Sequence, residues 1–219
     1  MKQFKGILLV LLSMNGAILW GQTTGIDANT PIYVGANETK SQEVNKRFFV
    51  GSSFFMLGNL MEDSPKYYRI DFGYRITSKD AIIIQPLTWA YHAPLGIPFG
   101  DSWELEQEDY PGSIQSFGIG VGYNRTLWKG LFTGVYVTPF KINYLDLNEN
   151  VIQSGFQLFL QFQLDYHVEF FNNRFYIEPG ITCNYWPITT NMPQSFTEVE
   201  DKWPNYFLFE PVLNFGFNF

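Results

Sequence analysis

Cysteine, histidine and long apolar runs are scarce in this chain, and each absence removes a class of protein. The one cysteine, Cys183, cannot form an internal disulfide and lies far from the start, where an N-terminal lipid anchor would attach. The two histidines, His92 and His167, cannot form a multi-histidine metal site. No run reaches the roughly 18 apolar residues that a membrane-spanning helix requires. The sequence therefore predicts no disulfide, no metal or other cofactor and no helical span.

Charged residues are also few, whereas aromatic residues are abundant. Charged side chains make up 16% of the chain, against roughly 25% in soluble domains. Aromatic side chains make up 19%, with 22 Phe and 13 Tyr. So much aromatic surface needs an apolar partner. The formal net charge of −7 gives no electrostatic reason to expect nucleic acid as a partner.

The first residues have the features of an export signal. Lys2 and Lys5 precede a short apolar stretch, and Gly21 offers a small residue for cleavage. We therefore predict a signal peptide over residues 1–21. Residues 22–46 are rich in Thr and Asn with weak periodicity, which predicts a flexible periplasmic segment.

The end of the chain has the period of a β-strand. From Phe207 to Phe219, apolar side chains occupy every second position, and successive side chains of a strand point to opposite faces. A soluble sheet with one face on a core would show this alternation. A transmembrane strand with lipid outside and a polar lumen inside would show it too. The tail alone leaves both interpretations open.

Eight extended segments follow one another after residue 46, and the connections between them alternate in length. Short turns join the second and third, fourth and fifth, and sixth and seventh segments, whereas the other connections are longer. An even number of strands then places both ends of residues 47–219 on the short-turn side. The predicted segments are about 47–58, 67–76, 81–91, 113–126, 131–144, 153–170, 175–186 and 205–219.

Export signal, eight amphipathic segments, sorted connections and a final aromatic strand together resemble the small eight-stranded outer-membrane barrels of Gram-negative bacteria, of the OmpA/OmpX type. The resemblance covers residues 47–219. It implies an all-β fold: an eight-stranded antiparallel transmembrane β-barrel, in an up-and-down meander, with periplasmic termini and outer-membrane lipid around it. In that class the last strand is recognised by the barrel-assembly machinery. The resemblance therefore implies that Phe215, Phe217 and Phe219 form an assembly signal.

Charged side chains on the predicted inner face suggest a filled lumen. A buried charge survives when it is paired and hydrogen-bonded, and the interior of an eight-stranded barrel is just wide enough for side chains to fill it. We expect Arg69 and Arg75 to meet Asp165 and Glu169 across the lumen. The whole predicted network consists of Arg69, Asp71, Arg75, Lys141, Asp165, His167, Glu169, Glu178 and Glu210.

Four prolines interrupt the predicted strands. Proline cannot donate its N–H to a ladder, so we expect a β-bulge at each of them. The inner and outer faces of the first, third and fifth segments are also blurred. The prolines are Pro86, Pro139, Pro179 and Pro211.

Two other functions remain as alternatives to a structural or surface-interaction barrel without catalytic activity. A lipid-modifying barrel enzyme needs a base, an acid and a nucleophile, for which His92, Asp101 and Ser102 are candidates. A secreted lipocalin-like barrel needs an apolar interior. The acidic loop 101–109 has oxygen ligands for a cation but lacks the spacing of a calcium loop, so a solvated loop is the expectation.

Overall fold

The structure is a computed structural model that describes residues 46–60, 64–98 and 105–219. The chain divides into two units, Met1–Asn45 and Lys46–Phe219. The predicted signal peptide 1–21 and all but the last residue of the predicted segment 22–46 lie outside the described residues. Everything that follows concerns the second unit.

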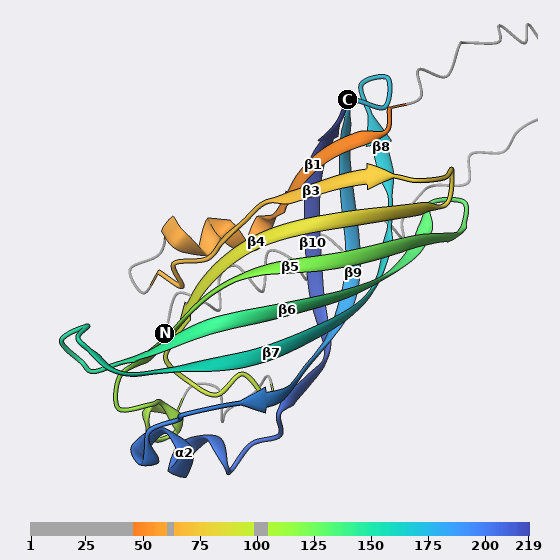
Figure 1. The fold of residues 1–219 in the computed structure, drawn as a ribbon. Coiled ribbons are helices and arrows are strands. Elements are labelled where there is room, and N and C mark those ends of the chain that lie inside the picture. Colours follow the sequence, from red (N-terminus) through yellow and green to blue (C-terminus); the bar gives the residue numbers. More distant parts are fainter. Residues whose placement is uncertain (1–45, 61–63, 99–104) are drawn as a thin grey trace, which may run out of the picture. The chain divides into compact units, whose positions relative to one another are not determined.

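Ten strands form a single antiparallel sheet that closes on itself (Figure 1). β2 and β3 follow one another in the same strand position of the ring, as do β7 and β8, so the ring has eight strand positions. The strands are β1 (Phe48–Ser53), β2 (Tyr68–Arg69), β3 (Asp71–Arg75), β4 (Asp80–Tyr91), β5 (Ser113–Trp128), β6 (Leu131–Leu145), β7 (Val151–Tyr166), β8 (Val168–Phe170), β9 (Phe175–Thr189) and β10 (Tyr206–Asn218).

The ring closes between the first and the last strand. β1 pairs with β10 in a register that sets Val50 opposite Phe217 and Ser53 opposite Asn214. All the remaining pairings join strand positions that are neighbours along the chain. The prediction of an eight-stranded antiparallel up-and-down barrel is confirmed by this pairing, and no sheet edge remains open along β1 and β10.

Connections sort by length as the sequence predicts. At one end of the barrel, short turns join β3 to β4, β5 to β6 and β8 to β9. At the other end, the longer connections carry the short helices η2 (Phe54–Leu60), η4 (Glu106–Glu108) and α2 (Gln194–Glu200), and a loop joins β6 to β7. Among the residues that the structure describes, no helix is long and apolar enough to cross a membrane.

Apolar side chains cover the outer face of the wall. Along β5, every second side chain from Phe117 to Leu127 points outward and is exposed, and Val121 at the middle of the strand is 56% exposed. At the end of the chain the outward positions include Phe217 of β10 and Phe219, which follows that strand. Further exposed apolar side chains of the wall are Phe48, Ile70, Phe72, Ile82, Ile84, Ile119, Val135, Val137, Phe156, Phe162, Leu164 and Ile181.

The half of the interior near the long connections is an aromatic core. Phe140 and Tyr144 of β6 are fully buried, and Trp186 of β9 stacks on Phe159 of β7 with ring centroids 6.0 Å apart. Phe196 of α2 is fully buried against Tyr110 and so closes this end. The cluster consists of Tyr67, Leu87, Tyr91, Tyr110, Ile114, Phe140, Ile142, Tyr144, Phe159, Trp186 and Phe196.

This apolar half explains an error in the predicted faces of β6. Phe140 and Ile142 point inward, so Lys141 between them points outward and is exposed. The prediction that Lys141 lies in the lumen is therefore wrong. Its ladder partners are Phe117 and Phe156 on the outer face. A lysine there can lay its aliphatic stem along apolar surface and extend its ammonium toward the membrane edge.

The tail is not one uninterrupted alternation. A register shift between Phe207 and Glu210 lets both side chains occupy the inner side, where Phe207 packs against the aromatic core. Phe209 at the shift has a positive φ of 60°. From Pro211 onward the odd positions point outward and the even positions inward. The alternation predicted from Phe207 therefore holds only beyond the bulge.

None of the four prolines carries the bulge that the sequence predicts. Each is paired in register: Pro86 with Ile119, Pro139 with Leu158, Pro179 with Leu213 and Pro211 with Ile181. The N–H of a strand residue serves one of its two neighbours, so a proline removes a bond on one side while the other ladder continues. At Pro139 the bridges to β5 lapse between Gly118 and Val121 without a change of register.

Candidate functional site: the barrel interior

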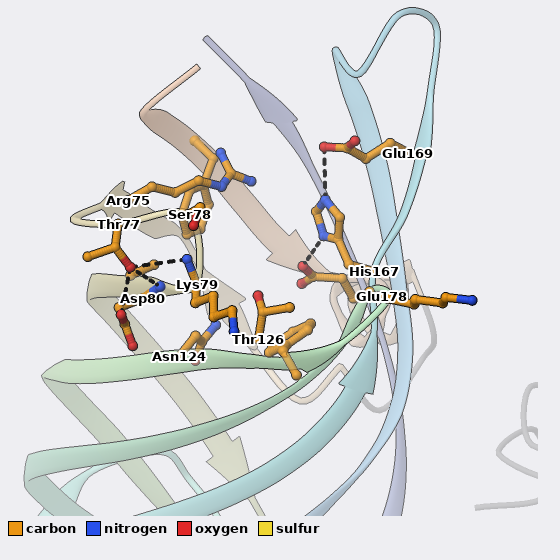
Figure 2. Close-up of a pocket in the computed structure, with 15 residues that line it drawn as sticks. Arg75, Thr77, Ser78, Lys79, Asp80, Asn124, Thr126, His167, Glu169 and Glu178 are labelled. Carbon is orange, nitrogen blue, oxygen red and sulfur yellow. Dashed lines mark hydrogen bonds and ion pairs between the residues drawn. The ribbon is translucent and has the colours of Figure 1, made fainter. Parts of the chain in front are cut away.

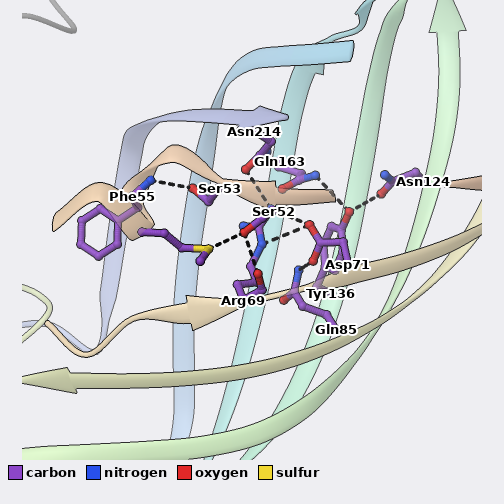
Figure 3. A network of polar contacts seen from close by, with 11 residues as sticks. Ser52, Ser53, Phe55, Arg69, Asp71, Gln85, Asn124, Tyr136, Gln163 and Asn214 are labelled. Atoms are coloured by element: carbon purple, nitrogen blue, oxygen red, sulfur yellow. Dashed lines mark hydrogen bonds and ion pairs between the residues drawn. The ribbon is translucent and has the colours of Figure 1, made fainter. Parts of the chain in front are cut away.

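A buried ion pair lies on the inner side of the wall (Figure 3). Arg69 directs Nε and Nη2 at one carboxylate oxygen of Asp71, at 3.1 and 2.7 Å. Nη2 also donates to Asn214 of β10 at 2.8 Å, and Gln85 of β4 donates to the other oxygen of Asp71 at 2.8 Å. Arg69 is 6% exposed and Asp71 8%. Both charges are thus paired and hydrogen-bonded, which buried charges require.

A phenol and two amides continue this polar layer across the lumen (Figure 3). Tyr136 of β6 donates to Asn124 at 2.9 Å and accepts a hydrogen bond from Gln163 at 3.1 Å. The aromatic ring of Tyr136 fills space that Gly122 and Gly134 leave, since a Cβ at either glycine would lie within 3 Å of it. Small residues on the wall therefore make room for large side chains that fill the interior.

Asp165 of β7 is a buried carboxyl group without a described partner. Its side chain is 1% exposed, and neither oxygen has a hydrogen-bond partner among the described residues. One oxygen occupies the space that a Cβ at Gly180 would take, at 1.7 Å from that position. A buried polar group without a partner is disfavoured, so we expect Asp165 to lower the stability of the barrel.

A second polar network lies near the short turns and runs through the last strand; Figure 2 shows its members Arg75, His167, Glu169 and Glu178. Arg75 donates to the side-chain oxygen of Asn218 at 2.9 Å, and the amide nitrogen of Asn218 donates to Glu169 at 3.1 Å. His167 then lies between two carboxylates, with Nε2 3.1 Å from Glu169 and Nδ1 2.6 Å from Glu178. One chain of contacts therefore joins β3, β10, β8 and β9.

Next to this network the lumen opens into a pocket of about 440 Å³. Arg75 and the turn from Thr77 to Asp80 lie on one side in Figure 2, and His167, Glu169 and Glu178 lie on the other. The remaining lining residues are Phe49, Ala81, Asn124, Thr126, Lys129, Gly130 and Phe132.

The predicted cross-lumen pairs do not form. Arg69 binds its neighbour Asp71 rather than Asp165 or Glu169. Arg75 has no ion pair with any described carboxylate; it donates to the carbonyl of Lys46 at 3.0 Å and to Asn218. Each guanidinium already has other acceptors, Asp71 and Asn214 for Arg69 and the Lys46 carbonyl and Asn218 for Arg75, so neither needs a carboxylate on the opposite wall.

Glu210 also lies inside, where Asn184 donates to it at 2.6 Å. Eight of the nine predicted network residues therefore lie on the lumen side: Arg69 and Asp71 in one network, Arg75, His167, Glu169 and Glu178 in a second, Glu210 paired with Asn184, and Asp165 isolated. The prediction missed the neutral side chains that connect the charges. The sequence does show Asn214 and Asn218 four residues apart, and hence on the same face of a strand whose outward positions are aromatic.

A third arrangement secures the cap at the long-connection end. Glu200 of α2 accepts hydrogen bonds from Tyr110 and, at 3.2 Å, from the indole N–H of Trp186. Burial raises the pKa of Glu200, and the hydrogen bonds from Tyr110 and Trp186 oppose this rise. Burial and the nearby charge of Glu200 raise the pKa of Tyr110. The contact ties α2 to the wall of the barrel.

The structure does not test whether the three residues proposed for a lipid-modifying enzyme lie together. His92 is exposed at the end of β4, and Asp101 and Ser102 lie outside the described residues. Of the acidic loop 101–109, the described part includes Glu108, which accepts hydrogen bonds from Trp203 and Lys202. No group of three or more ligating side chains suited to a metal occurs among the described residues.

Comparisons with known proteins add one likeness of fold. No protein-family model matches the chain, and no curated protein matches it. Among solved structures, the chain is similar to Neisserial surface protein A (NspA), with 17% sequence identity over 79% of this chain and 92% of that chain, at a TM-score of 0.40. The strand pairing described above, rather than this likeness, establishes the barrel.

Proposed function

We propose that the protein is an outer-membrane β-barrel with a plugged lumen, and that its role is structural or one of surface interaction, without catalysis. The observation that carries this proposal is the apolar outer face of the closed wall. Exposed aliphatic and aromatic side chains recur at every second position on neighbouring strands, as at Ile84, Val121 and Val137. Monomeric soluble proteins rarely expose apolar patches of more than a few hundred Å². A lipid bilayer would cover this surface.

The distribution of polarity argues against a secreted lipocalin-like barrel. Such a barrel needs water outside and an apolar ligand cavity inside. Here the outer wall is apolar, while half of the interior holds the buried Arg69–Asp71 pair and its amide partners. The other half is filled by the aromatic core.

Filling of both halves supports a lumen that conducts little. The aromatic core and Phe196 occupy the long-connection end, and the two polar networks occupy the rest. The pocket beside Arg75 lies at the short-turn end, next to the second polar network. Planar-bilayer recording of the purified protein should therefore give no stable, porin-like conductance. Large, stable channels would contradict the plug.

A pair of charge insertions tests membrane insertion. Val121 lies at the middle of β5 and Phe219 at the end of the wall, and both are exposed on the outer face. Val121→Arg should cost about 2–4 kcal/mol of stability in lipid vesicles, and Phe219→Arg about 0–1 kcal/mol, because the cost depends on depth in the bilayer. Equal small costs at both positions would mean that the wall does not face lipid.

Orientation follows from the sorted connections. We place the short turns and both termini of residues 47–219 in the periplasm, and the longer connections outside the cell, as is usual for such barrels. Epitope tags near Glu106 and Thr197 should be reachable on intact cells, and tags near Lys79 and Asn172 should not. The reverse pattern would invert the topology.

A lipid-modifying enzyme is the alternative, and it predicts a chemical change in the membrane. Mass spectra of lipid A from a deletion strain and from its parent should be identical if the barrel is not catalytic. A deletion-dependent change in acylation that the intact gene restores would favour the enzyme. In that case His92→Ala should reproduce the deletion, since a triad needs its base.

A further inference from the structure

The pocket at the short-turn end has the size and lining of a small-molecule site. Its volume of about 440 Å³ lies within the range of roughly 300–1,000 Å³ that is usual for ligand pockets. Charged side chains of both signs line it, and they come from different strands of the ring. Its chemistry differs from that of the sealed interior because several of these charges have unused bonding capacity.

On one side, the guanidinium of Arg75 is held in place without an anionic partner among the described residues. It donates to the carbonyl of Lys46 and to Asn218, both neutral acceptors. The guanidinium carbon Cζ of Arg75 lies 4.8 Å from the centroid of the Phe49 ring, which is a cation–π distance. An arginine has five N–H donors in a rigid fork that suits a carboxylate. Lys79, whose ammonium binds no described residue, adds a second positive charge to this side, where the carboxylate of Asp80 is already bound by Thr77, Tyr123 and Arg125.

On the other side, two carboxylates retain free acceptors. Glu169 and Glu178 each use Oε1 for His167, and no described residue bonds to Oε2 of either. Their side chains are 33% and 16% exposed, so the free oxygens can be reached. Three donors of an ammonium group match such oxygens.

One side chain, that of Asn218, connects the arginine side of the pocket to the carboxylate side. The amide of Asn218 accepts from Arg75 and donates to Glu169, so the anion-binding and cation-binding groups are separated by two hydrogen bonds and one primary amide. In an α-amino acid, a carboxylate oxygen and the ammonium nitrogen are about as far apart as the oxygen and nitrogen of this amide. A ligand whose negative end meets Arg75 and whose positive end meets Glu169 would have the same polarity as this amide.

We propose that this pocket binds a small dipolar molecule of the amino-acid class, with its carboxylate on Arg75 and its ammonium on Glu169 and Glu178. Lys79 contributes to the attraction of the carboxylate from the turn. Neither an inorganic anion nor a neutral sugar would satisfy both sides of the pocket.

Histidine-selective isotope labelling gives a direct test, because the chain has two histidines at opposite ends of the barrel. His167 lines the pocket, and exposed His92 at the other end serves as an internal control. The purified full chain, folded in detergent micelles, is titrated with L-alanine at constant pH while the imidazole resonances are recorded. The resonances of His167 should shift in a saturable manner, and those of His92 should not.

Blocked ligands and matched variants assign the two sides. N-acetylalanine lacks the ammonium and alaninamide lacks the carboxylate, so each should bind at least tenfold more weakly than alanine. Arg75→Gln and Glu178→Gln should produce the same loss, whereas Lys66→Gln, which breaks the distant exposed pair with Glu149, should leave binding unchanged.

Two results would overturn the proposal. One is the absence of any saturable shift of His167 at the highest soluble concentration of alanine. The other is binding of N-acetylalanine or inorganic phosphate as tight as that of alanine, which would mean a simple anion site. Both comparisons use the unmodified chain, so they remain decisive even if Arg75→Gln does not fold.

Discussion

Asn218 accepts a hydrogen bond from Arg75 at 2.9 Å and thereby fastens the last strand, β10, to β3 near the start of the barrel. The same amide donates to Glu169 and to the carbonyl of Asn173. On β10, Asn214 repeats this role four residues earlier by accepting from Arg69. The tail therefore closes the barrel with its asparagines on the inner face, while Phe217 and Phe219 point outward.

The first prediction concerns this connection. Asn218→Ala should lower the free energy of unfolding by about 1–3 kcal/mol, because it leaves partners of a partly buried network unsatisfied. Urea unfolding in lipid vesicles measures the change. Asn148→Ala, on the exposed β6–β7 connection, is the control and should stay within about 0.5 kcal/mol of the wild type. Equal effects of the two substitutions would mean that Asn218 does not stabilise closure.

The second prediction separates the two arginines of the lumen. Arg69→Leu strands the buried charge of Asp71 and should cost about 3–5 kcal/mol. Arg75→Leu removes two hydrogen bonds to neutral acceptors, each worth about 0.5–1.5 kcal/mol, so its cost should be smaller. Unfolding of both variants under one set of conditions gives the order. A larger cost for Arg75 would indicate a charge partner for it in the folded protein.

Strand positions and closure could be predicted from the sequence because the period of two and the turn residues are local signals. The same rule, polar inside and apolar outside, failed for β6 because half of the lumen is itself apolar. Phe140 and Ile142 belong to a core that exists only once Tyr110 and Phe196 arrive from distant loops. The sequence around Lys141 does not indicate these contacts with distant loops, so the prediction placed Lys141 on the wrong face of the strand.

The polar partners were harder to predict than the charges. Long-range matching of opposite charges suggested Arg75 with Glu169, and the structure does connect these two, but through Asn218. A neutral amide can accept and donate at once, which no count of charges reveals. Likewise, the carboxyl group of Asp165 has no described partner and lies in the space beside Gly180. The residues next to Asp165 in the sequence do not indicate this.

The third prediction follows from the isolation of Asp165. Asp165→Val keeps a similar shape and removes two buried, unsatisfied oxygens, so the free energy of unfolding should rise by about 1–3 kcal/mol. The measurement is the urea midpoint, with Asp146→Val on an exposed loop as the control. Asp146 accepts hydrogen bonds from Asn148 and Asn150, so its loss should not stabilise. A destabilised Asp165→Val would mean that the carboxyl group has a partner in the folded protein.

The fourth prediction concerns assembly. If the outward aromatic side chains at the end of β10 are the signal for the barrel-assembly machinery, deletion of Phe219 should reduce the amount of folded protein in the outer membrane. Heat-modifiable mobility of the protein in outer-membrane fractions measures folding. Spontaneous folding of the truncated chain in vesicles is the control and should be little changed, because Phe219 is 67% exposed and leaves no core cavity. Normal outer-membrane levels after deletion would exclude Phe219 from the signal.

The fifth prediction is a pH dependence at the cap formed by α2. Burial raises the pKa of Glu200, and the charge of Asp201 adds to this rise. An acid whose pKa is higher in the folded than in the unfolded protein favours folding when it is protonated. Its contribution is present below the unfolded pKa of about 4.5 and is lost as the pH rises through the folded value.

The indole of Trp186 reports this titration because its N–H donates to Glu200 at 3.2 Å. Its nitrogen-15 resonance should shift with a midpoint above pH 4.5, and the docked cap should become less stable over the same interval. Glu200→Gln keeps a hydrogen-bond acceptor but cannot ionise, so the shift should vanish. The pKa of Tyr110 is raised, so its phenol stays protonated throughout and cannot account for the midpoint. A midpoint at or below 4.5, or one that persists in Glu200→Gln, would show that another group controls the cap.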